Sequence, residues 1–167
     1  MLRLVLSLCG VLLVGACTKK DPAPAGPPRS ATADAHGFGE SIPWEPLEGA
    51  LAHAKSGGMP VMLVVHASWC KRCKELKPAF SDAELETLSQ RFVMVNADQD
   101  AQPEVLEYAP DGDYIPRVVF ISPQGVQDLT LNNESRERHR YFYTPGDDLV
   151  GVMRKALSRH ERTPPRS

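Results

Sequence analysis

Apolar residues along the middle of the chain fall into short continuous runs separated by polar turns. The run Met59–Val65 predicts a strand buried on both faces of a parallel sheet, and Phe92–Ala97 predicts a second strand. Val118–Ile121 and Val126–Leu131 flank a turn that contains proline and glycine, and they predict a hairpin of two further strands. The pattern therefore indicates a sheet with both parallel and antiparallel strands.

Apolar residues at helical spacing occur before, between and after these runs. The spacing predicts helices from Trp44 to Gly57, from about Cys70 to Phe80 with a kink at Pro78, from a capping box of Ser81 and Glu84 to Leu88, and from Thr144-Pro145 through Leu157. The polar stretch Asp98–Tyr108 predicts a loop with a helical turn. This order predicts an α/β fold in which helices flank both faces of a central mixed β-sheet.

The first 16 residues read as a targeting segment rather than as part of the fold. Arg3 precedes an apolar stretch of 11 residues, 4–14, which is shorter than the ~20 residues of a membrane-spanning helix and is typical of a signal peptide. The end of the segment resembles the lipobox of bacterial lipoproteins, which predicts lipidation of Cys17. Cleavage after Ala33 or Ala35 is the alternative.

Residues 17–40 hold four closely spaced prolines between Pro22 and Pro28 and predict a linker of roughly 25 Å. We expect one globular domain at 41–160 and a frayed tail at 161–167. The predicted location is a bacterial membrane, with the outer membrane favoured, the domain facing the periplasm and Cys17 carrying the lipid anchor.

Composition removes several classes of protein. The chain has 167 residues, 42% of them hydrophobic and 24% charged, with a formal net charge of −2. A nearly balanced charge offers no basic surface for nucleic acid. The ordinary apolar content excludes collagen-like, coiled-coil and fully disordered chains.

The cysteines point to chemistry rather than to a structural framework. Cys9 would leave with the signal peptide and Cys17 would carry lipid, so that Cys70 and Cys73 remain as one close pair outside the cytosol, where disulfides persist. An inert structural disulfide is the alternative, but such a short loop stabilises a fold little.

The pair lies where a buried strand is expected to pass into a helix. Unpaired N–H groups at a helix start favour an anion, and Lys71 and Arg72 add two positive charges, so we expect the pKa of the Cys70 thiol to lie below the ~8.5 of a free thiol. Cys73 follows one helical turn later. The predicted roles are attack by the Cys70 thiolate and resolution of the mixed disulfide by Cys73.

The chain resembles the thioredoxin superfamily over roughly residues 42–157. The resemblance rests on Trp69-Cys-x-x-Cys-Lys, on Pro78 five residues after Cys73, and on Ile115-Pro116 at the place of the superfamily's cis-proline. Residues 92–96, 110–117 and 141–143 are similar to the small single-domain thioredoxins of the endoplasmic reticulum that are related to the anterior-gradient proteins.

This resemblance implies a thioredoxin fold and thiol–disulfide oxidoreductase activity without an organic cofactor. It implies that the Ile115 backbone pairs with an extended segment of a substrate, that Pro116 shapes this groove and discourages metal binding at the cysteines, and that Trp69 shields the disulfide. The chain departs from thioredoxin at Val64, where thioredoxin has a buried proton-relaying Asp, and at Lys71-Arg72, where thioredoxin has Gly-Pro.

Other interpretations of the motif stay open. His66, Cys70 and Cys73, with His139, could bind copper(I) or zinc in a metallochaperone. The segment 70–74 also fits a rare haem-attachment pattern, and a client-binding module without catalysis is a further alternative.

Several side chains have both a functional and a structural interpretation. His66 could tune the thiolate or carry protons, or it could be a hydrogen-bonded core residue. His36, His53 and His160 are predicted at the surface. Residues 141–143 fit packing or peptide contact, and the basic stretch 135–140 fits a solvated loop or a site that selects acidic partners.

Taken together, these features predict a monomeric, membrane-tethered thiol–disulfide oxidoreductase. Its partners would be cysteine-containing exported proteins, a redox partner, and the membrane through lipid on Cys17. Stabilisation of the reduced thiolate by the helix start, Lys71 and Arg72 makes a disulfide more oxidising. The direction predicted is therefore oxidation or isomerisation rather than reduction.

Overall fold

The computed structural model of the protein describes residues 32–162. The predicted signal peptide, Cys17, the linker up to residue 31 and the end of the predicted tail lie outside the described residues. No helix of the described part is long and apolar enough to cross a membrane.

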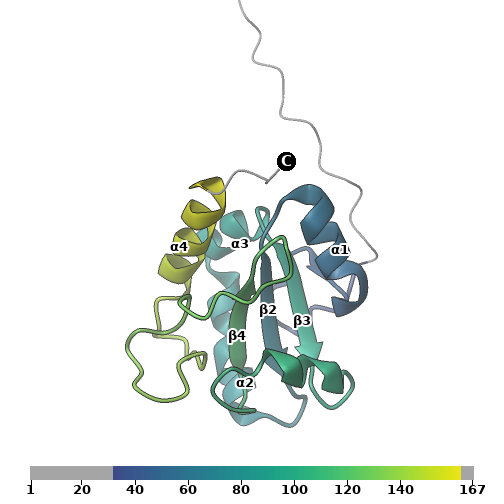
Figure 1. The fold of residues 1–167 in the computed structure, drawn as a ribbon. Helices are drawn as coiled ribbons and strands as arrows, with labels where there is room; N and C mark the ends of the chain where they lie inside the picture. Colours follow the sequence, from purple (N-terminus) through teal and green to yellow (C-terminus); the bar gives the residue numbers. More distant parts are fainter. Residues whose placement is uncertain (1–31, 163–167) are drawn as a thin grey trace, which may run out of the picture.

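A four-stranded mixed sheet forms the centre of the domain (Figure 1). Its strands are β1 (Trp44–Glu45), β2 (Val61–His66), β3 (Val93–Asp98) and β4 (Arg117–Ile121), in the order β1-β3-β2-β4. β1 and β2 run parallel to β3, and β4 runs antiparallel to β2. All six residues of β2 are buried, which confirms the prediction from its continuous apolar sequence.

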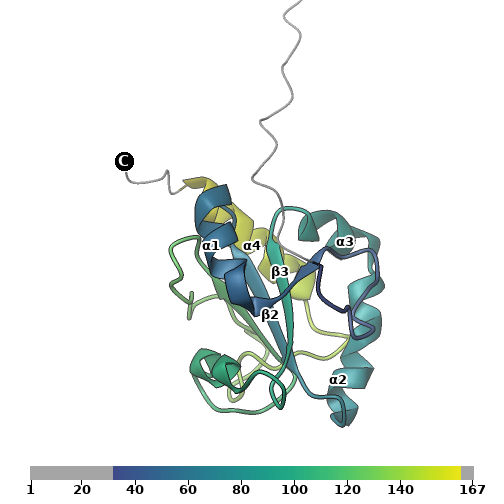
Figure 2. The same ribbon diagram turned by 90° about the vertical axis from the view of Figure 1, so that its right-hand side faces the viewer.

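Helices cover both faces of this sheet, as predicted (Figure 2). The helix α1 (Leu47–Gly57) packs on one face, and α2 (Lys71–Leu76), the 3₁₀ helix η1 (Lys77–Ser81), α3 (Ala83–Ser89) and α4 (Leu149–Arg162) belong to the other. The sheet has one hydrophobic core on each face, and alternate residues of β2 point into one core or the other. Leu63 lies in the core with Ala54 of α1, and Val64 lies in the core with Cys70 and Cys73.

The predicted strand Val126–Leu131 is wrong. Only one bridge, between Ile121 and Gln127, continues the sheet there. The Asp128 carboxylate accepts hydrogen bonds from the backbone N–H and the hydroxyl of Thr130, so it turns the chain away from β4. Instead, the Val118 N–H bonds the Tyr141 carbonyl at 2.9 Å, which brings the 139–142 segment to β4.

The first predicted helix begins later than expected. Trp44 is part of β1, and its indole N–H donates to the carbonyls of Phe38 and Gly39, both at 3.1 Å. The backbone enters α1 after Pro46 and departs from helical geometry at Glu48 and Gly49. Helical spacing alone did not reveal that Trp44 pairs with β3.

Two helix starts also differ from prediction. Asp82, not Ser81, caps α3 by accepting from the N–H groups of Glu84 and Leu85. α4 begins at Leu149 because the Asp147 carboxylate bonds the N–H and hydroxyl of Thr144 in a turn that precedes the helix.

The prediction that His53 and His160 lie exposed at the surface is also wrong. His53 is buried, and its Nδ1 lies 2.8 Å from a carboxylate oxygen of Glu45, which is buried as well. His160 is half-buried, whereas His36 is exposed as predicted.

Candidate functional site

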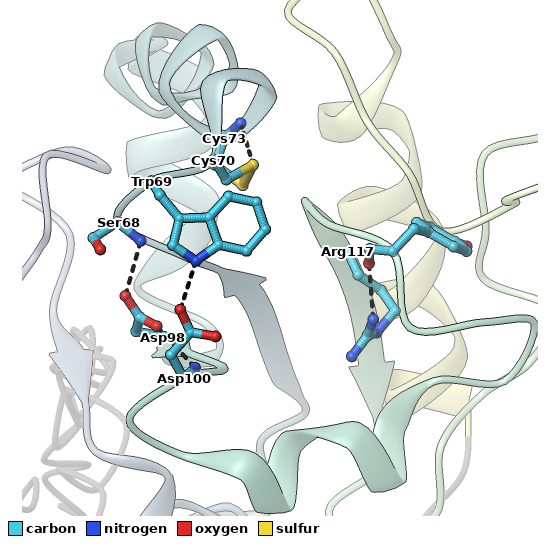
Figure 3. Close-up of a disulfide and its surroundings, with 8 residues drawn as sticks. Ser68, Trp69, Cys70, Cys73, Asp98, Asp100 and Arg117 are labelled. Atoms are coloured by element: carbon cyan, nitrogen blue, oxygen red, sulfur yellow. Dashed lines mark hydrogen bonds between the residues drawn. A yellow bond between two sulfur atoms is a disulfide. The ribbon is translucent and has the colours of Figure 1, made fainter.

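The candidate site centres on a disulfide between Cys70 and Cys73, whose Cα atoms lie 5.3 Å apart. Cys70 follows β2 and is the N-cap of α2, and its sulfur accepts a hydrogen bond from the Cys73 N–H at 3.0 Å (Figure 3). The Cys70 residue is 5% exposed and Cys73 only 1%. An incoming sulfur atom therefore meets Cys70 more readily than Cys73.

The positive charges around Cys70 are unequal. Lys71 and Arg72 are both exposed, but the Arg72 guanidinium bonds the Glu75 carboxylate at 2.8 Å. Lys71 forms no ion pair within residues 32–160. The N–H groups at the start of α2 and Lys71 thus remain the main stabilisers of a Cys70 thiolate.

Two carboxylates from the end of β3 hold the segment before Cys70 (Figure 3). Asp98 accepts from the Ser68 N–H at 3.0 Å, and Asp100 accepts from the Trp69 indole N–H at 2.6 Å. Trp69 is 65% exposed, so this hydrogen bond fixes a ring that packing alone leaves free. Sequence reasoning missed both aspartates. Their position at the end of the predicted strand 92–97 could have revealed them, because neighbouring parallel strands end at the same edge of a sheet.

We expect Asp100→Asn to loosen Trp69, because a neutral amide is a weaker acceptor than a carboxylate. The loss of about 1 kcal/mol of hydrogen bonding corresponds to a several-fold slower thiol exchange at Cys70. Trp69 fluorescence and stopped-flow exchange kinetics measure the two effects. Glu40→Gln, the same change at an exposed carboxylate, is the matched control, and an equal response of both variants would contradict the proposed role of Asp100.

His66 lies at the end of β2 and is 2% exposed. Its ring centroid lies 5.0 Å from that of His36 and 5.1 Å from that of Phe38, and its Nε2 is buried without a hydrogen-bond partner. Burial lowers the pKa of His66, with His36 adding to the effect and Asp98 opposing it. His66 is buried, as the structural interpretation predicts, but one ring nitrogen is unsatisfied.

This environment predicts a pH dependence of stability. Because the folded-state pKa of His66 lies below the unfolded value of 6.5, the unfolded chain binds the proton first. The contribution to stability is complete above pH 6.5 and is lost as the pH falls towards the folded-state pKa. Urea unfolding should therefore give His66→Phe a smaller loss of stability than wild type between pH 7 and pH 5. Equal losses of stability in the variant and in wild type would contradict this interpretation. Burial also lowers the pKa of His160, so some dependence of stability on pH remains in the variant.

Ile115 and Pro116 reach the same end of the sheet. Their peptide bond is cis, as the resemblance implied, and Pro116 is buried. Arg117 pairs with Val65 across β2 and β4, so Pro116 lies level with the end of β2. Ile115 packs against the core that contains Cys70 and Cys73. The structure thus brings together the predicted site residues at 66, 69–73 and 115–116.

Comparison with known proteins places the chain in a family. A thioredoxin-like family model matches residues 43–123. Anterior gradient protein 3 of Mus musculus is 32% identical over 94% of this chain and 96% of its own length, and anterior gradient protein 1 of Xenopus laevis is 35% identical over 84% and 78%. The chain belongs to the anterior gradient branch of the thioredoxin superfamily.

Solved structures confirm the thioredoxin fold of this anterior gradient relative. A thioredoxin from Thermus thermophilus superposes with a TM-score of 0.55, at 22% identity, over 72% of this chain and 90% of its own. The DsbH oxidoreductase superposes with a TM-score of 0.52, at 21% identity, over 83% and 96%. At these identities the likeness concerns the fold alone.

The remaining candidate side chains of this thioredoxin-fold protein have structural partners. His139 lies against Tyr114, with ring centroids 4.5 Å apart, and no group of three or more His, Cys, Asp or Glu in the described chain is placed to hold a metal ion. Tyr141 and Tyr143 are buried, which confirms the packing interpretation for both. In the basic loop, Arg136 bonds the Asp147 carboxylate and lies over the Phe142 ring.

Proposed function

We propose that the protein is a thiol–disulfide oxidoreductase in which Cys70 and Cys73 form the redox-active pair. The observation that carries the proposal is the asymmetry of the disulfide. The Cys70 sulfur accepts an N–H at the start of α2, whereas Cys73 is almost completely buried. A leaving or attacking sulfur is thereby stabilised at Cys70 and the resolving sulfur is kept from solvent.

In the reductive direction, the Cys70 thiolate attacks one sulfur of a client disulfide. A Cys70–client S–S bond forms, and the client's other sulfur leaves as a thiolate that takes a proton from solvent. Cys73 then loses its proton and attacks the Cys70 sulfur. The client's second thiolate leaves, so the client gains two electrons and the Cys70–Cys73 disulfide is restored.

The oxidative direction runs through the same mixed disulfide. A client thiolate attacks Cys70, Cys73 leaves as a thiolate, and a second client thiolate then displaces Cys70 to form the client disulfide. The protein keeps the two electrons, and a disulfide-bearing redox partner must remove them. Stabilisation of the thiolate by the α2 start and Lys71 favours this direction, although the Arg72–Glu75 ion pair reduces the contribution of Arg72.

We further propose that the clients are exported proteins with cysteines and that lipid on Cys17 tethers the enzyme to a bacterial membrane, with the domain facing the periplasm. The support is the signal-like segment, the lipobox-like end and the proline-rich linker. Mass spectrometry of Cys17 in membrane fractions tests the anchor, and an unmodified or absent Cys17 would overturn it.

The test of the enzymatic proposal is turnover of a fluorescent peptide in its disulfide and dithiol forms. Wild type should accelerate exchange, and the variant with both Cys70 and Cys73 replaced by Ser should not. A double variant that still binds the peptide equally well, beside an inactive wild type, would instead support a client-binding module.

A further inference from the structure

Arg117 is a buried cation that the exchange chemistry does not use. It begins β4 directly after the cis-proline and is 0% exposed. Its guanidinium contacts carbonyl oxygens rather than a carboxylate: Tyr114 at 2.8 Å, Tyr108 at 2.9 Å, Val105 at 3.3 Å and Gly112 at 3.5 Å.

Burial of an arginine without a carboxylate is unfavourable for stability alone. A charge taken out of water needs compensation, and apolar residues of similar size often serve a core as well or better. Burial correspondingly lowers the pKa of Arg117. The guanidinium supplies what an apolar residue cannot, namely several N–H donors in a rigid fork. The role of Arg117 is therefore to hold the segment whose carbonyl groups these donors bind.

All four carbonyls belong to one segment, residues 105–114. Its only regular element is η2 (Pro103–Tyr108), and Gly112 has a φ of 132°. A second anchor holds the same segment from outside, because the Tyr114 hydroxyl donates to Asp111 and accepts from the Tyr141 N–H at 3.0 Å. Arg117 is thus the inner anchor of the loop that ends at Ile115.

This loop ends in backbone groups at the same end of the sheet as the disulfide. Within residues 32–162, the N–H and carbonyl of Ile115 form no hydrogen bond, although Ile115 is half-buried against the core that contains Cys70 and Cys73. In Figure 3, Arg117 lies across from Trp69 and the disulfide. Unpaired backbone groups at a sheet end suit an extended peptide.

We propose that Arg117 is a positioning residue for client binding: by tying down residues 105–114 it holds the Ile115 backbone ready for the extended segment around a client cysteine. This inference rests on the proposed function. It predicts a role in recognition of peptides, and none in the exchange step with a small disulfide that does not reach Ile115.

The test compares Arg117→Lys with wild type on a disulfide peptide and on the small disulfide cystamine. Lysine keeps the charge but loses the fork, so KM for the peptide should rise about tenfold. The value of kcat and the rate with cystamine should stay within about twofold of wild type, and the reduction potential should not change. Arg154→Lys is the control, because the exposed Arg154 guanidinium on α4 bonds the Glu84 carboxylate on α3 and contacts nothing in this loop.

Equal losses with peptide and cystamine, an unchanged peptide KM, or the same rise in KM for Arg154→Lys would overturn the role of Arg117. Inactivity of wild type with both disulfides would instead overturn the proposed function. If Arg117→Lys does not fold, NMR spectroscopy of the wild-type protein tests the role of Arg117 instead. The buried Arg117 Nε–H resonance should shift when the peptide is added, and an unmoved resonance at saturating peptide would overturn the proposal.

Discussion

Replacement of Cys73 by serine is expected to arrest the protein as a mixed disulfide through Cys70. Without the resolving thiol, a client disulfide that the Cys70 thiolate attacks stays attached through one sulfur while its other sulfur leaves as a thiolate, and turnover falls on the order of a thousandfold or more. Non-reducing electrophoresis and intact-mass measurement should show the client's mass added to the protein.

Cys70→Ser provides the decisive control for this prediction. The remaining thiol, Cys73, is 1% exposed and lies behind Cys70, so it should form almost no mixed disulfide. Both variants lose the disulfide, so its loss does not explain a difference in trapping between them. Equal trapping by Cys70→Ser and Cys73→Ser would contradict the assigned order of attack and resolution.

The second large effect concerns stability, at the buried pair of Glu45 and His53. Glu45→Leu removes the partner of His53 Nδ1, which lies 2.8 Å from the carboxylate, while His53 Nε2 already lacks a partner. Both ring nitrogens would then be buried and unsatisfied. We expect a loss of about 3 kcal/mol in the free energy of unfolding, measured by urea denaturation.

A double variant separates the hydrogen bond from simple packing. Glu45→Leu with His53→Leu removes both polar groups and should recover at least half of the lost stability, because paired removal avoids the unsatisfied nitrogens. Glu48→Leu, at an exposed carboxylate in the same segment, should change stability by less than about 0.5 kcal/mol. A double variant less stable than Glu45→Leu would refute the assignment.

The sequence allowed prediction of those parts of the site that depend on neighbours along the chain. Cys70, Cys73 and the helix start are fixed by one strand-to-helix junction, and the both-sided burial of β2 follows from its continuous apolar residues. The cis bond at Pro116 was reached through the family resemblance rather than through the residues themselves.

What could not be predicted depends on contacts between distant elements. Asp98 and Asp100 reach Ser68 and Trp69 only because β3 lies parallel to β2 in a particular register. The burial of Arg117 depends on a loop that closes over it, and a charged residue is by default expected near solvent.

Local turn chemistry accounts for another error. The alternation of Val126–Leu131 resembles a strand, but the bonds of Asp128 to Thr130 bend the chain, and Val126 and Leu129 remain exposed. Whether a short alternating segment forms a strand depends on such side-chain hydrogen bonds as much as on its periodicity.

The reduction potential of the Cys70–Cys73 pair, titrated against glutathione in the purified protein, tests the central claim most directly. A reversible two-electron couple between about −120 and −180 mV is expected for a pair that donates or reshuffles disulfides. A reversible value near −270 mV, that of thioredoxin, would keep the enzyme but reverse the proposed direction. A pair that does not cycle between its disulfide and dithiol forms would contradict thiol–disulfide exchange as the function of this protein.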